Sequence, residues 1–200
     1  MAAPIDFYFD FSSPYGYFAA DRIDAVAAKH GRTVTWRPVL LGAIFKVSGG
    51  QPLPSIPLKG PYSLRDIPRS ATYYGLPYRQ PTRFPVATVS AVRAYYWAEA
   101  LDPARAVTLA KAILTGYFQM DRDISDAKTI IAIGSEAGFD SVAMEAGIGD
   151  LVVKDRVKRE TDAAIVRGVF GSPYLIIDGE PFWGMDRFDQ ADRWLQTGGW

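Results

Sequence analysis

The chain has 200 residues, of which 48% are hydrophobic, and its 22 acidic and 22 basic residues give a formal net charge of zero. This composition is typical of a globular protein and lacks the basic excess that marks nucleic-acid and membrane-surface binders. No apolar run approaches the roughly 18–20 residues that a membrane-spanning helix needs. The first residues also lack the features of a secretory leader, so we expect a cytoplasmic protein with no nucleic-acid or membrane partner.

The content of cysteine and histidine restricts the chemistry further. The sequence has no cysteine, which excludes a thiol nucleophile, a redox dithiol and thiolate-bound zinc or iron–sulfur sites. Its one histidine, His30, precedes Gly31 in the last turn of a predicted helix, where a structural role is expected. We therefore expect no metal site, and a Ser–His–Asp triad would have to use His30.

The N-terminal part predicts a strand, a helix and a second strand. Residues 5–11 alternate between apolar and polar types and are rich in aromatics, as in a strand. From Pro14, apolar residues recur at spacings of three and four, which predicts a helix over 14–30 that ends at Gly31. The stretch "TVTWRPVL" (33–40) predicts the next strand. Together these elements indicate a βαβ unit.

The middle of the chain differs in character. Eight prolines lie from Pro52 to Pro85, and the stretch "SGGQPLPSIPLKGPY" (48–62) predicts no long regular element. The interleaved Leu, Ile and Tyr residues favour an ordered, packed segment over a linker. Helical signals then dominate to Arg167. The clearest helices are predicted over 103–120, from Ser125 or Asp126 to Gly138, and from Asp150 to Gly168.

Strand character returns near the C-terminal end. Two short strands, "PYLIID" (173–178) and "EPFWG" (180–184), are joined by an Asp-Gly pair that is typical of a hairpin turn. The stretch "MDRFDQADRWLQ" predicts a closing helix.

The order βαβ, helical segment and ββα resembles a thioredoxin fold interrupted by a helical domain. We therefore predict an α/β protein with a thioredoxin-like domain formed by residues 1–41 and 168–200. The remaining residues, 42–167, would form a helical insertion domain.

The stretch "FYFDFSSPYGYF" (7–18) carries the predicted site. Ser13 and Pro14 are typical of a helix start, as N-cap and first helical residue. In thioredoxin-like proteins the catalytic group lies at this junction, facing a cis-proline that would here be the Ser172-Pro173 bond. Ser13 and Gly16 stand where such proteins have two cysteines, so disulfide chemistry is excluded.

Four motifs extend the resemblance over nearly the whole chain. "DFYFDFSSPYGY", "PLKGPY", "GVFGSP" and "FWGMDR" occur in order and resemble the 2-hydroxychromene-2-carboxylate isomerases, relatives of kappa-class glutathione transferases on a DsbA-like scaffold. The resemblance implies glutathione as cofactor, a homodimer and Ser13 as the catalytic residue that stabilises the glutathione thiolate. It places further glutathione contacts at Lys59, Ser172, Pro173, Met185 and Asp186.

Other residues are assigned with alternatives. Tyr15, Phe84 and Trp183 are candidates for an aromatic substrate site, although aromatic residues in such elements also form core. Asp186 has a second reading as a helix N-cap. Two positions depart from the family pattern: Gly50 replaces an asparagine of kappa transferases, and Ala87 replaces an asparagine of many isomerases.

Three functions are compatible with these residues. The first is a glutathione-dependent isomerase that interconverts 2-hydroxychromene-2-carboxylate and trans-o-hydroxybenzylidenepyruvate, or a related aromatic catabolite, by reversible thiolate addition. The second is a kappa-like transferase that releases glutathione conjugates. The third is a thioredoxin-like module that binds glutathione or a peptide without catalysis.

Overall fold

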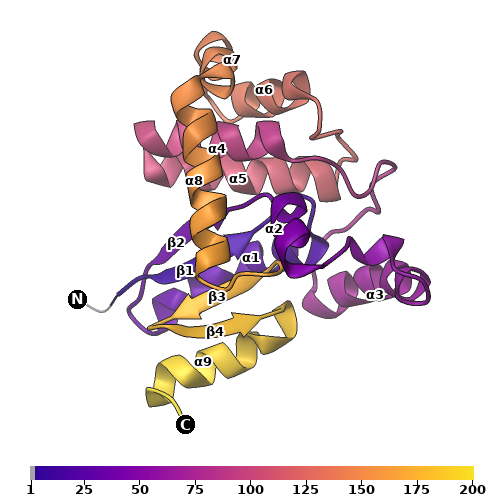
Figure 1. Ribbon diagram of the computed structural model, residues 1–200, viewed down its shortest axis with the longest axis vertical. Helices are drawn as coiled ribbons and strands as arrows, with labels where there is room; N and C mark the ends of the chain where they lie inside the picture. The colour runs from indigo at the N-terminus through magenta and orange to yellow at the C-terminus, as the bar shows by residue number, and fades with distance from the viewer. Residues whose placement is uncertain (1–2) are drawn as a thin grey trace.

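A computed structural model describes residues 3–200 of the chain (Figure 1). Its centre is a four-stranded mixed sheet with the strand order β2-β1-β3-β4. Strand β1 pairs in parallel with β2 and antiparallel with β3, and β3 forms a hairpin with β4. The strands span Ile5–Phe9 (β1), Val34–Pro38 (β2), Tyr174–Ile177 (β3) and Glu180–Trp183 (β4). The predicted pairing of the N-terminal and C-terminal strands in one sheet is confirmed.

The alternation of side chains along β1 gives the sheet two buried faces. Phe7 and Phe9 point to one face, where they stack on each other and meet the edge of Trp36. Tyr8 points to the other face, in a smaller cluster with Ile44 and Ala164. Because both faces are covered, β1 lies at the centre of the fold.

Helix α1 (Pro14–Lys29) follows β1 almost directly and packs on the sheet. It begins at Ser13, whose side chain caps the first turn, and Pro14 occupies the first helical position. Its opposite end is capped by His30, whose Nε2 lies 2.6 Å from Asp192 Oδ1. The predicted structural role of His30 agrees with this contact, at the far end of α1 from Ser13.

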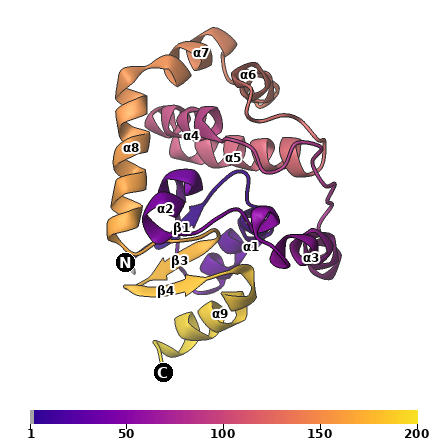
Figure 2. The same cartoon turned by 45° about the vertical axis from the view of Figure 1, so that its right-hand side comes forward.

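Seven helices lie between β2 and β3 in the described chain. They are α2 (Leu41–Ser48), α3 (Lys59–Tyr74), α4 (Val89–Leu101), α5 (Pro103–Phe118), α6 (Ala127–Glu136), α7 (Ser141–Gly149) and α8 (Leu151–Val166), with a short 3-10 turn, η1 (Leu53–Ser55), before α3. Figure 2 shows α4 to α7 as a helical layer beyond one end of the sheet, from which α8 returns alongside the strands.

These helices confirm a thioredoxin-like fold with a helical insertion. The division at residues 41/42 and 167/168 stays a prediction, since the larger apolar core runs without a break from the sheet through α1 into α4 and α5. No helix within residues 3–200 is both long enough and apolar enough to cross a bilayer.

The expectation of no long regular element over residues 48–62 is wrong at the C-terminal end of that stretch, because the 16-residue helix α3 begins at Lys59. Pro61 lies in the first turn, where its missing N–H costs no helical hydrogen bond. Pro68 lies inside α3 but on the exposed face, so the carbonyl left without a partner one turn earlier can be hydrated. Ile67 and Ala71 bury the opposite face, and this packing outweighs the cost of the proline.

The chain ends in a 3-10 turn, η2 (Met185–Arg187), and helix α9 (Phe188–Thr197). The predicted closing helix is thus divided. The alternative reading of Asp186 as an N-cap is wrong, because α9 begins after Arg187 and no side chain caps it. Asp186 instead pairs with the neighbouring Arg187 at 3.0 Å.

Candidate functional site

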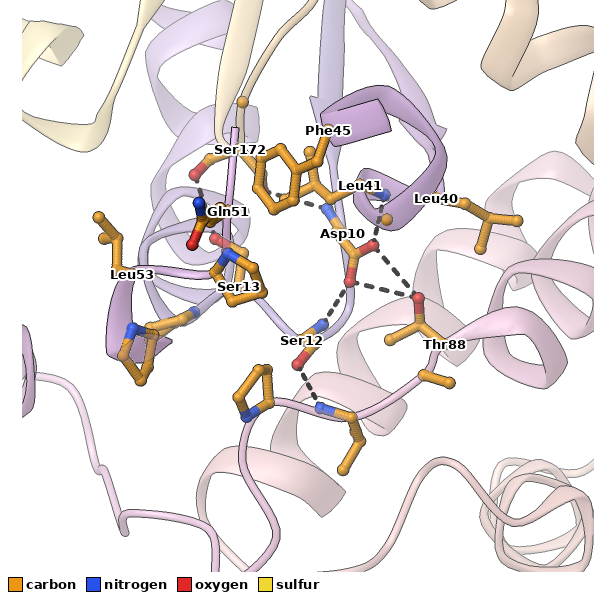
Figure 3. Close-up of a pocket in the computed structure, with 18 of the residues that line it drawn as sticks. Asp10, Ser12, Ser13, Leu40, Leu41, Phe45, Gln51, Leu53, Thr88 and Ser172 are labelled. Carbon is orange, nitrogen blue, oxygen red and sulfur yellow. Dashed lines mark hydrogen bonds between the residues drawn. The ribbon is translucent and has the colours of Figure 1, made fainter. Parts of the chain in front are cut away.

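A cavity of about 550 Å³ opens where β1 passes into α1 (Figure 3). Its walls come from five segments that are far apart in the sequence, together with Ile67 and Trp183. These segments lie within residues 10–15, 40–46, 51–54, 84–89 and 171–172. Much of the wall is apolar, with Phe45 and Leu53 among its side chains. This size and lining suit a small aromatic molecule.

Ser13 lies at the base of the cavity and is nearly buried, with 8% of its surface exposed. Its hydroxyl makes two hydrogen bonds. Oγ accepts from the Gly16 N–H at 3.0 Å, which is the helix cap, and donates to the Ser172 carbonyl at 3.1 Å. Ser13 is therefore the predicted N-cap and also a hydroxyl donor directed at the opposite wall of the site.

The second half of the site comes from the segment before β3. The Ser172–Pro173 peptide bond is cis, as predicted. The Ser172 side chain accepts a hydrogen bond from the Asp10 N–H at 3.1 Å. A Cβ atom at Gly16 would lie 2.8 Å from Ser172 Oγ, so only glycine allows α1 and this segment to approach so closely.

Asp10 is the buried acid beside the cavity. Its carboxylate accepts hydrogen bonds from Ser12 N at 2.8 Å, Leu41 N at 2.9 Å and Thr88 Oγ1 at 3.2 Å (Figure 3). Burial raises the pKa of the Asp10 carboxyl above its ordinary value of 3.8, and these hydrogen bonds oppose the rise.

The structure brings the three predicted aromatic residues to the cavity wall: Tyr15, Phe84 and Trp183. The Tyr15 hydroxyl donates to Asp66 of α3 at 2.6 Å. Burial and the Asp66 carboxylate together raise the pKa of the Tyr15 phenol, so it remains protonated. Trp183 is 54% exposed and packs its ring against Phe170, which leaves an aromatic edge at the cavity mouth.

Four of the predicted glutathione contacts lie outside the cavity wall: Lys59, Pro173, Met185 and Asp186. Pro173 is buried and follows Ser172 through the cis peptide bond. Lys59 is exposed at the first position of α3, and Asp186 is exposed in η2. Met185 is 3% exposed and its side chain belongs to the hydrophobic core. Ala87, one of the two departures from the family pattern, lines the cavity, whereas Gly50 lies beside the ring of Phe45.

Lys46 is a functional candidate that the sequence did not reveal. It lies on α2 and is the single basic residue among the described residues that line the cavity. The stretch "AIFKVSGG" gave no signal for it, because α2 is only eight residues long and the cavity is assembled from distant segments. In residues 3–200 no group of three or more His, Asp or Glu side chains is placed to hold a metal ion.

Comparison with known proteins agrees with this geometry. Residues 4–196 match the family described as the DSBA-like thioredoxin domain. The chain is 30% identical over 187 residues to a 2-hydroxychromene-2-carboxylate isomerase of Pseudomonas putida, covering 92% of this chain and 89% of the relative. It is 25% identical over 208 residues to the kappa 1 glutathione S-transferase of Rattus norvegicus, covering 96% and 92% of the two chains.

A solved structure of a 2-hydroxychromene-2-carboxylate isomerase superposes with a TM-score of 0.83 at 26% identity, covering 96% of this chain and 94% of that one. The match thus extends over the sheet, the helical insertion and the segments that line the cavity. The chain belongs to the DsbA-like thioredoxin-domain family and, within it, to the family of 2-hydroxychromene-2-carboxylate isomerases and kappa-class glutathione transferases.

Proposed function

We propose that this protein is a glutathione-dependent isomerase of a small aromatic carboxylate such as 2-hydroxychromene-2-carboxylate. The observation that carries the proposal is the position of the Ser13 hydroxyl. It lies at the N-terminus of α1, at the base of an apolar cavity and within hydrogen-bonding distance of the Ser172 backbone. The names of the relatives support the same reaction.

The residues present fit glutathione. A thiolate at the base of the cavity would meet the positive end of α1, which favours an anion. The Ser13 hydroxyl can rotate its proton from the Ser172 carbonyl to the sulfur, while Gly16 N–H continues to donate to Ser13 Oγ. The Ser172 carbonyl, once released, can accept from a backbone N–H of the tripeptide.

Ser13 therefore acts as a hydrogen-bond donor to sulfur and not as a nucleophile. Glutathione, held by Ser13 and the Ser172 backbone, would supply a thiolate for reversible addition to the substrate's conjugated double bond. The residues that line the cavity would hold the reacting sulfur and carbon close together.

The substrate end of the cavity supports an aromatic acid. Phe45, Phe84 and Trp183 provide apolar and aromatic surface for a ring. Lys46 places a cation on the same wall, where it can pair with a carboxylate. We assign Tyr15 to this wall as well, with its hydroxyl held by Asp66.

The outer part of glutathione would extend from Ser13 along the cavity mouth. We assign Ser172 and Pro173 to its cysteinyl backbone, Lys59 to a carboxylate, and Asp186 to its amine. Met185, whose side chain is buried, would contribute through its backbone. The exposure of Lys59 and Asp186 leaves both charges accessible to a ligand.

Product analysis tests the proposal. The protein is mixed with glutathione and 2-hydroxychromene-2-carboxylate, and both trans-o-hydroxybenzylidenepyruvate and free thiol are followed. We expect isomer to form while thiol stays constant, and S-methylglutathione to give no turnover. Stoichiometric loss of thiol into a conjugate would identify a transferase instead, and binding without turnover would identify a binding module.

A further inference from the structure

Asp10 connects the segments that surround Ser13. Through its side chain it accepts from Ser12 N, Leu41 N and Thr88 Oγ1, which belong to the β1–α1 turn, α2 and the start of α4. Through its backbone it donates to Ser172 Oγ and accepts from the Ser13 N–H at 2.9 Å. One residue thus contacts four of the chain segments that line the cavity.

The two helices that it contacts lack side-chain caps of their own. The N-cap of α2 is Leu40, which has no side-chain acceptor, and the Thr88 side chain does not cap α4 because it is directed at Asp10. The Asp10 carboxylate instead accepts the first N–H of α2 and the hydroxyl that precedes α4. It therefore stands in for a capping residue at α2. At α4 it fixes the side chain of the N-cap residue, Thr88, and does not cap the helix.

Burying the Asp10 carboxylate also costs desolvation free energy. Asp10 is 5% exposed and is the one charged residue in the buried core of residues 3–200. The groups that donate to its carboxylate are two backbone amides and a hydroxyl, all neutral. Burying a carboxylate without a cation costs free energy, so a side chain that only filled this space would be apolar.

We propose that Asp10 is a positioning residue that sets the width of the cavity beside Ser13. Its carboxylate holds the first turn of α2 and the residue before α4 against the β1–α1 turn. Those two helices contribute Phe45, Lys46 and Val89 to the wall of the cavity. The kinetic part of this inference rests on the proposed function, whereas the structural part does not.

The test uses Asp10→Asn, which keeps the shape but leaves one acceptor oxygen for two backbone N–H groups. Thr88→Val, which removes only the hydroxyl, serves if the first variant does not fold. Ser63→Ala is the matched control, because Ser63 is buried and its hydroxyl donates to the Gly60 carbonyl within α3. Amide hydrogen exchange and isomerase kinetics are measured on all three.

We expect the first-turn amides of α2, Leu41 included, to exchange about tenfold faster or more in Asp10→Asn, because a charge-assisted hydrogen bond is lost. Hydrogen exchange of the amides near Thr88 should accelerate in both Asp10→Asn and Thr88→Val. Exchange in neither region should change in Ser63→Ala. The substrate KM should rise about tenfold in Asp10→Asn with kcat within about threefold, as expected for loosened binding walls.

Unchanged exchange at Leu41 and Thr88 in folded variants would overturn the inference. A fall in kcat at constant KM would also overturn it, since that pattern assigns Asp10 to the chemical step. If the unmodified protein has no isomerase activity, the proposed function fails, but the exchange measurement still decides whether Asp10 holds α2 and α4.

Discussion

The Ser13 hydroxyl donates to the Ser172 carbonyl across 3.1 Å, so the two halves of the site contact each other directly. A ligand sulfur that accepts a hydrogen bond from the Ser13 hydroxyl must also break this bond. The Ser172 carbonyl then becomes available to the ligand backbone in the same step. Binding of the sulfur and binding of the peptide are therefore expected to be coupled.

Ser13→Ala tests the role of the hydroxyl. A charge-assisted hydrogen bond is worth roughly 1.5–3 kcal/mol, so the pKa of bound glutathione should rise by about 1–2 pH units, measured from thiolate absorbance. Loss of the cap should cost about 1 kcal/mol of unfolding free energy, so the protein should still fold.

Asp102→Ala is the matched control for Ser13→Ala. Asp102 caps α5, which like α1 has 16 residues and begins with proline. Unlike Ser13, Asp102 does not line the cavity. It should lose similar stability and leave the thiol pKa unchanged. If Ser13→Ala behaves like Asp102→Ala in both measurements, Ser13 is a cap and nothing more.

Lys46→Met and Lys59→Met should separate the two ligands. An exposed ion pair is worth up to about 1 kcal/mol, so each loss should raise one KM about fivefold. Lys46→Met should affect the aromatic carboxylate, and Lys59→Met should affect glutathione. Steady-state kinetics with each ligand varied in turn gives both values. The assignments are wrong if the effects are exchanged or if both variants raise both KM values equally.

Gly16→Ala should destabilise the protein despite the higher helix propensity of alanine. The propensity gain is about 1 kcal/mol, but the new Cβ would lie 2.8 Å from Ser172 Oγ and 3.2 Å from Ser13 Cβ, and such overpacking costs about 1–3 kcal/mol. Displacing Ser172 Oγ would also break its bond with the Asp10 N–H. Chemical denaturation gives the free energy of unfolding.

Two further variants test whether the loss of stability in Gly16→Ala comes from contact with Ser172. Gly149→Ala, in α7, has no atom within 4 Å of the new Cβ and should gain up to about 1 kcal/mol. Adding Ser172→Ala to Gly16→Ala should recover part of the loss, which a double-mutant cycle measures. Strict additivity in that cycle would show that the two side chains do not compete for space.

Asp10 should give the stability a pH dependence of unusual sign for a carboxylate. Because burial raises its folded pKa above the ordinary 3.8, its contribution is fully present below that value and is lost as pH rises through the folded pKa. Relative to Asp10→Asn, the unmodified protein should therefore lose stability as the pH rises through the folded pKa of Asp10. A difference that grows with pH instead would mean that the ionised form is the favoured one.

The parts of the fold set by local pattern could be read from the sequence. Strand β1, helix α1 with its Ser13 cap and the β3–β4 hairpin depend on periodicity, capping and a turn pair, all visible within a few residues. Helix α3 could not be predicted by the same means, because its stability comes from burying Ile67 and Ala71 against distant segments, which offsets Pro68.

Local sequence patterns likewise predicted only part of the candidate site. The motif identified Ser13, and resemblance identified the segment before Pro173, which the structure places opposite it. Lys46 and Thr88 could not be found, since neither has a local signature and each reaches the cavity through contacts between segments that are far apart in the sequence.

The close packing around Gly16 also affects whether cysteine substitutions could give this protein a dithiol site. Ser13→Cys alone would place one thiol at the helix start, and a disulfide formed there with glutathione would have no neighbouring sulfur to resolve it. A second cysteine at position 16 would first need Ser172 to give way, since its Cβ would lie 2.8 Å from Ser172 Oγ. Dithiol chemistry at this helix start therefore depends on the side chain at position 172 as well as on those at positions 13 and 16.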